Sequence, residues 1–357
     1  MTLKTEFFLG ANSAEGFYSL YDQLREGERM RDLIVLKGGP GVGKSTFMRC
    51  IGNQAEEKGL QIEYIRCSGD PDSLDAVWLP QLGTAVVDGT APHVVEPAYP
   101  AAVGRYVNLG QFYNVDRLKE RRREIVACTN GYQAEYGKAY ACLHACGAVR
   151  AEMEGSAGAG FDYEKLRRRL KNIWQRERGK KRGGIGREQH RFLGGLTPAG
   201  RWWCTDSLFA LCGRIYDLQD SYHLTAVALE ELRGIVCADG FDVLLCLDPD
   251  CPARIAHLLI PQLSLAFVTT DHTFVLPEKA ARRVRVEAMM DRERLRTLRG
   301  GLRLKRRLAE ALEEEGAEHL RLAGEKHKEL ELIYHPFVDF DGVMDLAARE
   351  SRRIFGA

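Results

Sequence analysis

Long apolar runs are missing from this chain. No stretch approaches the roughly 18 consecutive apolar residues that a membrane-spanning helix needs. The amino-terminal region is also unlike a secretory signal, because Lys4 and Glu6 are followed by only a short apolar pair. We therefore expect no membrane span and a cytoplasmic location.

An excess of charge of either sign is missing as well. The 51 Lys and Arg residues nearly balance the 50 Asp and Glu residues, so the formal net charge is +1 and any attraction to nucleic acid or to an anionic membrane must be local. The strongest basic stretch lies at 175–190, and a second basic group lies at 303–307. Acidic residues follow nearby and aromatic residues are scarce. We interpret both groups as solvated surface and do not expect nucleic acid as a partner.

Cysteine pairs at metal-binding spacing are absent. The chain has ten cysteines but no Cys-x-x-Cys pair, and the closest are Cys142 with Cys146 and Cys246 with Cys251. Cys142 and Cys146 are one helical turn apart, but the nearby His144 points to another helix face, which disfavours a metal there. We expect most cysteines to be reduced and buried as small apolar residues.

The chain does contain a complete phosphate-binding loop. It follows the apolar run at 33–36 and consists of Gly38, Gly39, Pro40, Gly41, Val42, Gly43, Lys44, Ser45 and Thr46. Glycines let the backbone turn its N–H groups around phosphate oxygens, which side chains would obstruct. Lys44 is expected to reach the β- and γ-phosphates, and Ser45 to bind Mg²⁺. The helix beginning near Lys44 would direct its positive end at the phosphates.

Strands and helices alternate around this loop. The sequence predicts strands at 33–36, 61–67 and 84–87 and a helix at about 44–57 that Gly59 ends. Such alternation predicts a parallel sheet with right-handed crossovers, whose ligand lies at the carboxyl ends of the strands. The loop, Asp70, Asp72 and Asp88 all emerge at that edge.

Asp88 is the candidate carboxylate for a Mg²⁺-bound water, because it closes an apolar strand after the loop. An Asp-Gly turn is the competing interpretation. Many hydrolysing loops have a Glu directly after this Asp, whereas position 89 is Gly and the first later Glu is Glu96. We therefore doubt fast autonomous hydrolysis.

Asp70 and Asp72 are candidates for orienting a substrate hydroxyl or a Mg²⁺-bound water, as general bases do in phosphoryl transfer. Asp-Pro-Asp is equally an ordinary helix-start turn, so both interpretations stay open. His93 lies on the loop after the third strand. A solvated histidine is favoured there over one that contacts substrate.

Short motifs recur in order along the chain. Phe8-Leu9-Gly10 recurs as Phe192-Leu193-Gly194, Leu79-Pro80-Gln81-Leu82 as Ile260-Pro261-Gln262-Leu263, and Phe161-Asp162 as Phe340-Asp341. The offset is about 180 residues each time, which indicates tandem duplication of one domain. The composition, 45% hydrophobic and 28% charged, is globular, and 357 residues allow two domains of ordinary size.

Each half ends in helical sequence. Tyr132, Tyr136, Tyr140 and Leu143 form a packing stripe at helical spacing, and a further helix is predicted from Asp162 to about residue 178. The counterpart runs from about 291 to 328, interrupted at Gly300-Gly301, and ends in a helix near 342–355. These appendages are a lid, a dimerisation arm or a cover for one sheet face.

Four segments carry a family resemblance. They are 8–22, the phosphate loop with its preceding Leu36-Lys37, 67–75 and 88–93. Together they resemble an uncharacterised bacterial family of duplicated P-loop ATPase-like proteins, over essentially the whole chain. The resemblance implies a P-loop NTPase fold and ATP binding by residues 38–46, with no established substrate.

The second half departs from that pattern. After the apolar run at 215–218 it has Gln219-Asp220-Ser221-Tyr222-His223-Leu224-Thr225-Ala226, without glycines or lysine, and Asp88 aligns with Thr269. We therefore expect an α/β protein of two tandem parallel-sheet domains: an ATP-binding unit at 1–174, a basic linker at 175–190 and a degenerate unit at 191–357.

Three functions compete on this basis. The leading hypothesis is a slow Mg²⁺-dependent ATPase or nucleotide switch that uses Lys44 and Asp88. The first alternative is a small-molecule kinase with Asp70 and Asp72 on the acceptor side. The second is an ATP-sensing scaffold or a nucleic-acid binder that uses the basic linker. The sequence leaves the acceptor, the partner and the oligomeric state open.

Overall fold

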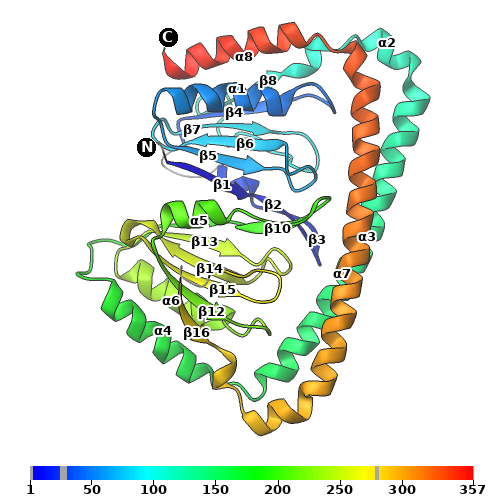
Figure 1. Cartoon of the computed structure of the whole chain (residues 1–357). Coiled ribbons are helices and arrows are strands. Elements are labelled where there is room, and N and C mark those ends of the chain that lie inside the picture. Colours follow the sequence, from blue (N-terminus) through cyan, green and yellow to red (C-terminus); the bar gives the residue numbers. More distant parts are fainter. Residues whose placement is uncertain (1–2, 25–29, 278–280, 357) are drawn as a thin grey trace.

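The computed structural model describes residues 3–24, 30–277 and 281–356 and has an α/β architecture. Two six-stranded sheets lie one above the other, and two long helices run along one side of both (Figure 1). No helix among the described residues is long and apolar enough to cross a lipid bilayer.

The first sheet has the strand order β1-β5-β6-β7-β4-β8. Its strands are β1 (Lys4–Phe8), β4 (Asp32–Lys37), β5 (Ile62–Arg66), β6 (Leu74–Leu79), β7 (Thr84–Asp88) and β8 (Gly104–Asn108). Strand β6 is antiparallel to β5 and β7, and the other pairs are parallel. The expectation of an all-parallel sheet was therefore wrong. The turns on either side of β6 are too short for the crossover that parallel strands need.

The second sheet repeats this topology, with the order β9-β13-β14-β15-β12-β16. Its strands are β9 (Glu188–Arg191), β12 (Arg214–Gln219), β13 (Val243–Leu247), β14 (Ile255–Ile260), β15 (Leu265–Thr270) and β16 (Ala281–Arg285). Strand β14 is again the antiparallel one. A small hairpin follows the first strand of each half, formed by β2 (Gly10–Ser13) with β3 (Gly16–Ser19) and by β10 (Gly194–Thr197) with β11 (Gly200–Trp203).

The two sheets pack against each other through a shared apolar core. Alternate residues of one strand divide between its two faces: Val35 of β4 lies in the shared core, whereas Ile34 and Leu36 lie in a separate cluster under the helices. Ala266 and Val268 of β15 supply the shared core from the other sheet. Burial on both faces explains why these strands are nearly continuous apolar runs. The short helix α5 (Thr205–Leu211) contributes Leu208 to this shared core, and longer helices cover the outer face of each sheet (Figure 1).

On each outer face, the helix pair combines one helix from each half of the chain (Figure 1). Helix α1 (Lys44–Glu57) packs against α8 (Phe340–Phe355) from the end of the chain, and α6 (Ala226–Ala238) packs against α4 (Tyr163–Glu177), which precedes the second sheet. Leu166, Leu170 and Ile173 of α4 lie buried in the second sheet's outer cluster. The boundaries expected at 174 and 190 divide the sequence into two halves. In the structure, the last helix of each half packs on the outer face of the other half's sheet.

Helices α3 (Arg122–Gly158) and α7 (Arg292–Tyr334) form a long antiparallel pair, with the short α2 (Val115–Glu120) before α3. The predicted tyrosine stripe does pack: the rings of Tyr132, Tyr136 and Tyr140 contact one another in sequence, and Tyr132 contacts His327 of α7. The predicted interruption at Gly300-Gly301 was wrong, because α7 is continuous there. Packing along a partner helix offsets the cost of two glycines, about 1 kcal/mol each.

The third sequence repeat is shifted in register. Asp162 caps α4 by accepting from the Lys165 N–H, and Asp339 caps α8 by accepting from the Gly342 N–H. Phe161-Asp162 therefore corresponds to Val338-Asp339, not to Phe340-Asp341. Side chains of similar type two residues apart produced the wrong alignment.

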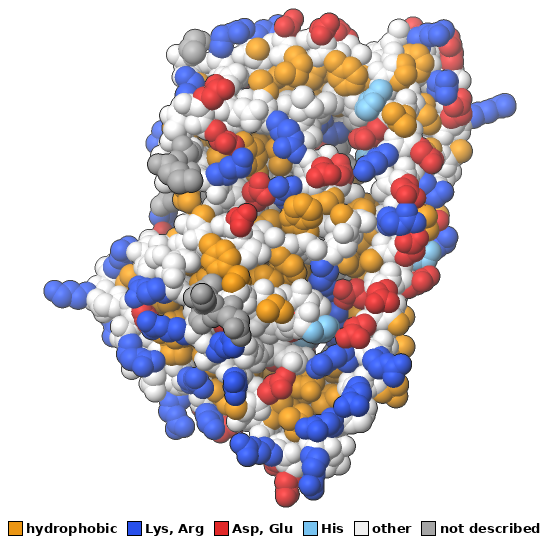
Figure 2. Space-filling view, viewed as in Figure 1, with side chains coloured by type: hydrophobic (Ala, Val, Ile, Leu, Met, Phe, Trp, Pro, Cys, Tyr) orange, Lys and Arg blue, Asp and Glu red, His pale blue; other side chains and the backbone are white. Residues whose placement is uncertain are grey.

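Basic residues gather at one end of the molecule. Figure 2 shows Lys and Arg side chains over α4 and the amino-terminal part of α7, with carboxylates along the middle of α7. Within the predicted linker, Arg178 and Lys181 form ion pairs with Asp239, and Arg182 stacks over the Phe241 ring. Part of the linker's positive charge is therefore compensated by contacts with residues of the second half.

Candidate phosphate-binding site

The glycine-rich loop connects β4 to α1 at the carboxyl edge of the first sheet. Gly41 and Gly43 have φ values of 67° and 91°, which side chains rarely tolerate. The Lys44 ammonium group donates to the carbonyl oxygens of Gly38 (2.7 Å) and Gly39 (3.0 Å). The local fold is thus a strand, a tight loop and a helix, the context that the motif requires.

Asp88 lies beside this loop because β7 is the neighbour of β4 in the sheet. Its Oδ1 accepts from the Thr90 N–H (2.8 Å) and the Thr90 hydroxyl (2.6 Å). Its Oδ2 lies 3.5 Å from the Lys44 Nζ. Ser45, one residue along α1, accepts from the Leu74 N–H through its hydroxyl oxygen (3.0 Å). The fold therefore brings together two segments that are over forty residues apart in sequence.

The second half of the chain also touches the loop. A Cβ at Gly41 would lie 2.9 Å from Cδ2 of His335, in the turn between α7 and α8. A Cβ at Gly43 would contact Val343 and Phe340 of α8. Close approach as well as backbone conformation thus requires glycine at position 41. Residues about 300 positions away line this side of the loop.

Asp70 and Asp72 occupy the turn between β5 and β6. Asp70 accepts from the Ser73 hydroxyl (2.6 Å), and Asp72 is exposed with its backbone carbonyl bound by Arg49. These are contacts of a turn, so the geometry favours the turn interpretation of this pair. Thr46, the last residue of the motif, is exposed in the first turn of α1.

The structure contains a buried polar cluster beside Asp88 that the sequence did not lead us to expect. Asp75 accepts from the Tyr21 hydroxyl (2.6 Å) and lies 3.3 Å from the His93 Nε2, while Cys67 completes the group. Burial raises the pKa of Asp75, of Tyr21 and of the Cys67 thiol. The interpretation of His93 as a solvated loop residue was wrong, because it is only 6% exposed. The sole signal in the sequence was a polar residue, Asp75, at the start of an apolar strand.

The chain was compared with protein-family models, curated proteins and solved structures. No protein-family model matches it, and no curated protein or solved structure is significantly similar to it.

In the equivalent loop of the second half, the side chain of Asp220 binds backbone N–H groups of the loop itself. It lies between β12 and α6, as the sequence predicted. The Asp220 carboxylate accepts from the backbone N–H groups of Tyr222 (3.0 Å) and Thr225 (2.8 Å). Thr225 in turn shares a hydrogen bond with Thr269, at the position equivalent to Asp88. A carboxylate thus occupies backbone donors of this loop.

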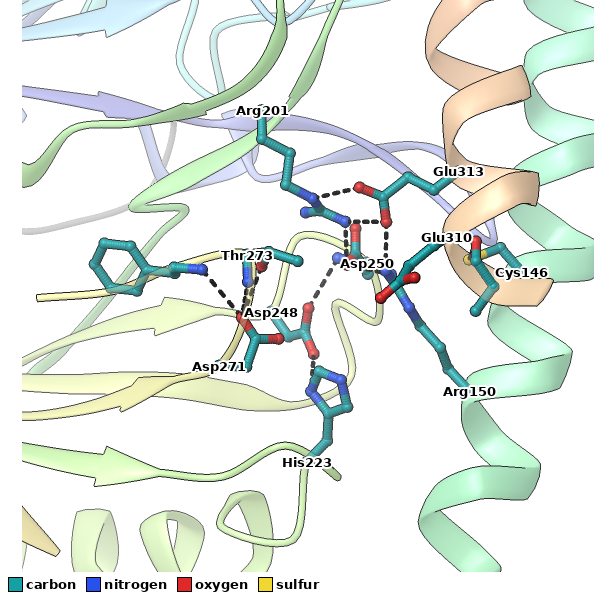
Figure 3. A network of polar contacts seen from close by, with 12 residues as sticks. Cys146, Arg150, Arg201, His223, Asp248, Asp250, Asp271, Thr273, Glu310 and Glu313 are labelled. Atoms are coloured by element: carbon teal, nitrogen blue, oxygen red, sulfur yellow. Dashed lines mark hydrogen bonds and ion pairs between the residues drawn. The ribbon is translucent and has the colours of Figure 1, made fainter. Parts of the chain in front are cut away.

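Next to this loop, four partly buried charged side chains join the second half to the helix pair (Figure 3). Arg201 of β11 binds Asp250 (2.7 Å) and Glu313 (2.6 Å), and Arg150 of α3 binds the same two carboxylates. Burial alone would lower the pKa of Arg201, but the carboxylates outweigh it and raise that pKa. The same two arginines hold the pKa of Asp250 well below its usual range, against the opposing effect of burial.

Proposed function

We propose that this protein is a P-loop NTPase-like protein that binds one Mg·ATP and acts as a slow ATPase or nucleotide-dependent switch. The observation that carries the proposal is the placement of Lys44 between the loop carbonyls and Asp88, at the end of a strand and the start of a helix. Backbone N–H groups, a lysine and a helix amino terminus are the elements that bind a triphosphate.

Ser45 and Asp88 fit Mg²⁺, because a hydroxyl and a carboxylate supply the oxygen ligands that this ion prefers. When bound, Mg²⁺ neutralises charge on the phosphates. Asp88 would hold a water molecule of that ion, and Thr90 orients the other oxygen of the carboxylate. Lys44 exchanges its loop carbonyls for phosphate oxygens, which leaves its charge compensated in both states.

Slow turnover follows from what surrounds the site. Position 89 is Gly, and Glu96 is bound to Lys37 (2.8 Å) and to the Tyr106 hydroxyl. Glu96 is therefore engaged elsewhere and does not take the part of a water-polarising Glu. Among the described residues, the second-half side chains nearest to Gly41 and Gly43 are His335, Val343 and Phe340, and none of them carries the fixed charge of an arginine finger.

The contact between the glycine-rich loop and His335 supports the proposal of a nucleotide-dependent switch. The loop touches the turn that joins α7 to α8, and α7 runs the length of the helix pair. A triphosphate that moves the loop therefore displaces a segment continuous with that pair. ATP and ADP would act differently only through contacts of the γ-phosphate.

ATP turnover with and without a mixture of small metabolites tests the activity. Free phosphate in both assays supports hydrolysis. A phosphorylated metabolite in place of free phosphate would support the kinase alternative, and ATP binding without turnover would support a sensor.

Replacing Asp88 by Asn should impair Mg²⁺-dependent turnover more than nucleotide binding, because the carboxylate acts on the metal's water. We expect at least a tenfold loss of turnover with a much smaller change in ATP affinity. The matched control is Asp116→Asn, a highly exposed carboxylate on α2. Unchanged turnover in Asp88→Asn would make Asp88 a turn residue only.

Calorimetry should find one ATP per chain. Asp220 already bonds two loop N–H groups of the second half, and the lysine is missing there. Two equivalent sites, or binding that survives Lys44→Ala and disappears on changing residues 219–226, would contradict this expectation.

A further inference from the structure

The cluster beside Asp88 consists of three side chains from three segments. Cys67 follows β5, Asp75 begins β6, and His93 lies on the loop after β7. Each offers one ligand atom, and these atoms all lie within 4.8 Å of one another. A thiol, an imidazole and a carboxylate are the three classes of side chain that bind zinc in proteins.

The spacing suits a single metal ion. With bonds of about 2.0–2.3 Å to nitrogen, oxygen and sulfur, ligand atoms at two corners of a tetrahedron lie about 3.3–3.6 Å apart. The His93 Nε2 and the Asp75 Oδ2 are separated by 3.3 Å. The pair therefore already has the separation of two ligands on one ion.

The surroundings of His93 hold its imidazole in a buried position. His93 is 6% exposed, and its Nε2 lies next to the Asp75 carboxylate. The Phe17 and Tyr21 rings pack against the imidazole at centroid distances of 5.1 and 4.7 Å, which restricts access of water.

Asp75 has the support that metal-bound carboxylates usually have. The Tyr21 hydroxyl donates to its Oδ2 at 2.6 Å, and Tyr21 itself is 1% exposed. Such outer contacts fix the orientation of a ligand and raise metal affinity. A simple Asp75–His93 ion pair would also use the 3.3 Å contact, and the Cys67 thiol interacts with the same carboxylate. What distinguishes a metal site from that pair is the convergence of one ligand atom from each of the three side chains.

We propose that Cys67, Asp75 and His93 form a binding site for Zn²⁺, distinct from the Mg²⁺ position at Ser45 and Asp88. Sulfur and nitrogen ligands select a softer ion than Mg²⁺, which takes oxygen ligands. The ion ties the end of β5, the start of β6 and the loop after β7 together. Ala76 pairs with Val87 in the sheet, so the ion holds the residues directly next to Asp88.

The test uses the full-length chain, stripped of metal with a chelator and titrated with Zn²⁺ against a chromophoric competitor. We expect one Zn²⁺ per chain and at least a tenfold weaker affinity in Cys67→Ser and in His93→Gln. Tyr21→Phe should weaken binding by about tenfold, as loss of an outer contact does. Cys50→Ser is the matched control, since this cysteine lies on α1 outside the cluster.

Co²⁺ provides a direct reading on the parent chain, in case a variant fails to fold. A thiolate-to-cobalt charge-transfer band in the parent and in Cys50→Ser supports the site. Absence of that band, no stoichiometric Zn²⁺, or equal affinity in Cys67→Ser and parent would overturn it. Lys44→Ala should bind Zn²⁺ as the parent does, so the metal site and the ATP site can fail separately.

Discussion

Replacing Lys44 by alanine should weaken ATP binding by roughly 10- to 150-fold. In the proposed complex the ammonium group of Lys44 faces the β- and γ-phosphates, and the substitution removes it; charge-assisted hydrogen bonds contribute about 1.5–3 kcal/mol each. Lys44 is only partly buried and contacts its own loop and Asp88, so the core does not depend on it. Calorimetric titration with Mg·ATP measures the effect.

Lys58→Ala is the matched control, because Lys58 is exposed at the other end of the same helix. Its affinity for ATP should equal that of the parent. An unchanged affinity in Lys44→Ala would remove the basis for nucleotide binding at this loop. Circular dichroism of both variants would show that the fold is retained.

Replacing Arg201 by methionine should lower the free energy of unfolding by about 3–5 kcal/mol, the usual cost of breaking a buried ion pair. Asp250 and Glu313 would then keep Arg150 as their ion-pair partner within the described part of the chain. Urea denaturation of the full chain measures the loss. Arg321→Met is the control, because Arg321 pairs with carboxylates on an exposed face of α7 and its loss should leave the urea midpoint nearly unchanged.

The same network predicts a dependence of stability on pH. The pKa of Asp250 is depressed in the folded chain, so its contribution is present above the ordinary carboxyl pKa and is lost as the pH falls toward the folded value. Asp248 and His223 lie beside it, and burial raises the pKa of Asp248, which opposes part of this effect. We expect Arg201→Met to reduce the loss of stability below about pH 4. An identical acid profile would contradict the assignment to Asp250.

Local patterns predicted local structure well. The loop follows a strand and precedes a helix that ends at Glu57, shortly before Gly59 at positive φ, and α4 spans almost the residues expected. These features depend on residues within a few positions of one another: an apolar period, a capping Asp and a glycine at positive φ. The position of the degenerate loop was predicted for the same reason, since it follows the repeated strand.

The buried cluster of Cys67, Asp75 and His93 could not be predicted from such local patterns. In the sequence, Cys67, Asp75 and His93 have the features of ordinary residues in a turn, a strand and a loop. They lie close together because β6 is antiparallel and sits between β5 and β7. An antiparallel insertion was not expected because alternating strands and helices favour parallel pairing. The side chains converge only once the order of the strands is known.

By itself, the sequence located the glycine-rich loop between a strand and a helix, its absence from the second half, and the repetition of one arrangement of strands. Each of these depends on neighbouring residues or on repeated short motifs. The tertiary structure decided that the two sheets share one core, that α4 and α8 exchange partners, and that His335 touches the loop. Those contacts join residues far apart in the chain, and burial of apolar faces between complete elements selects them.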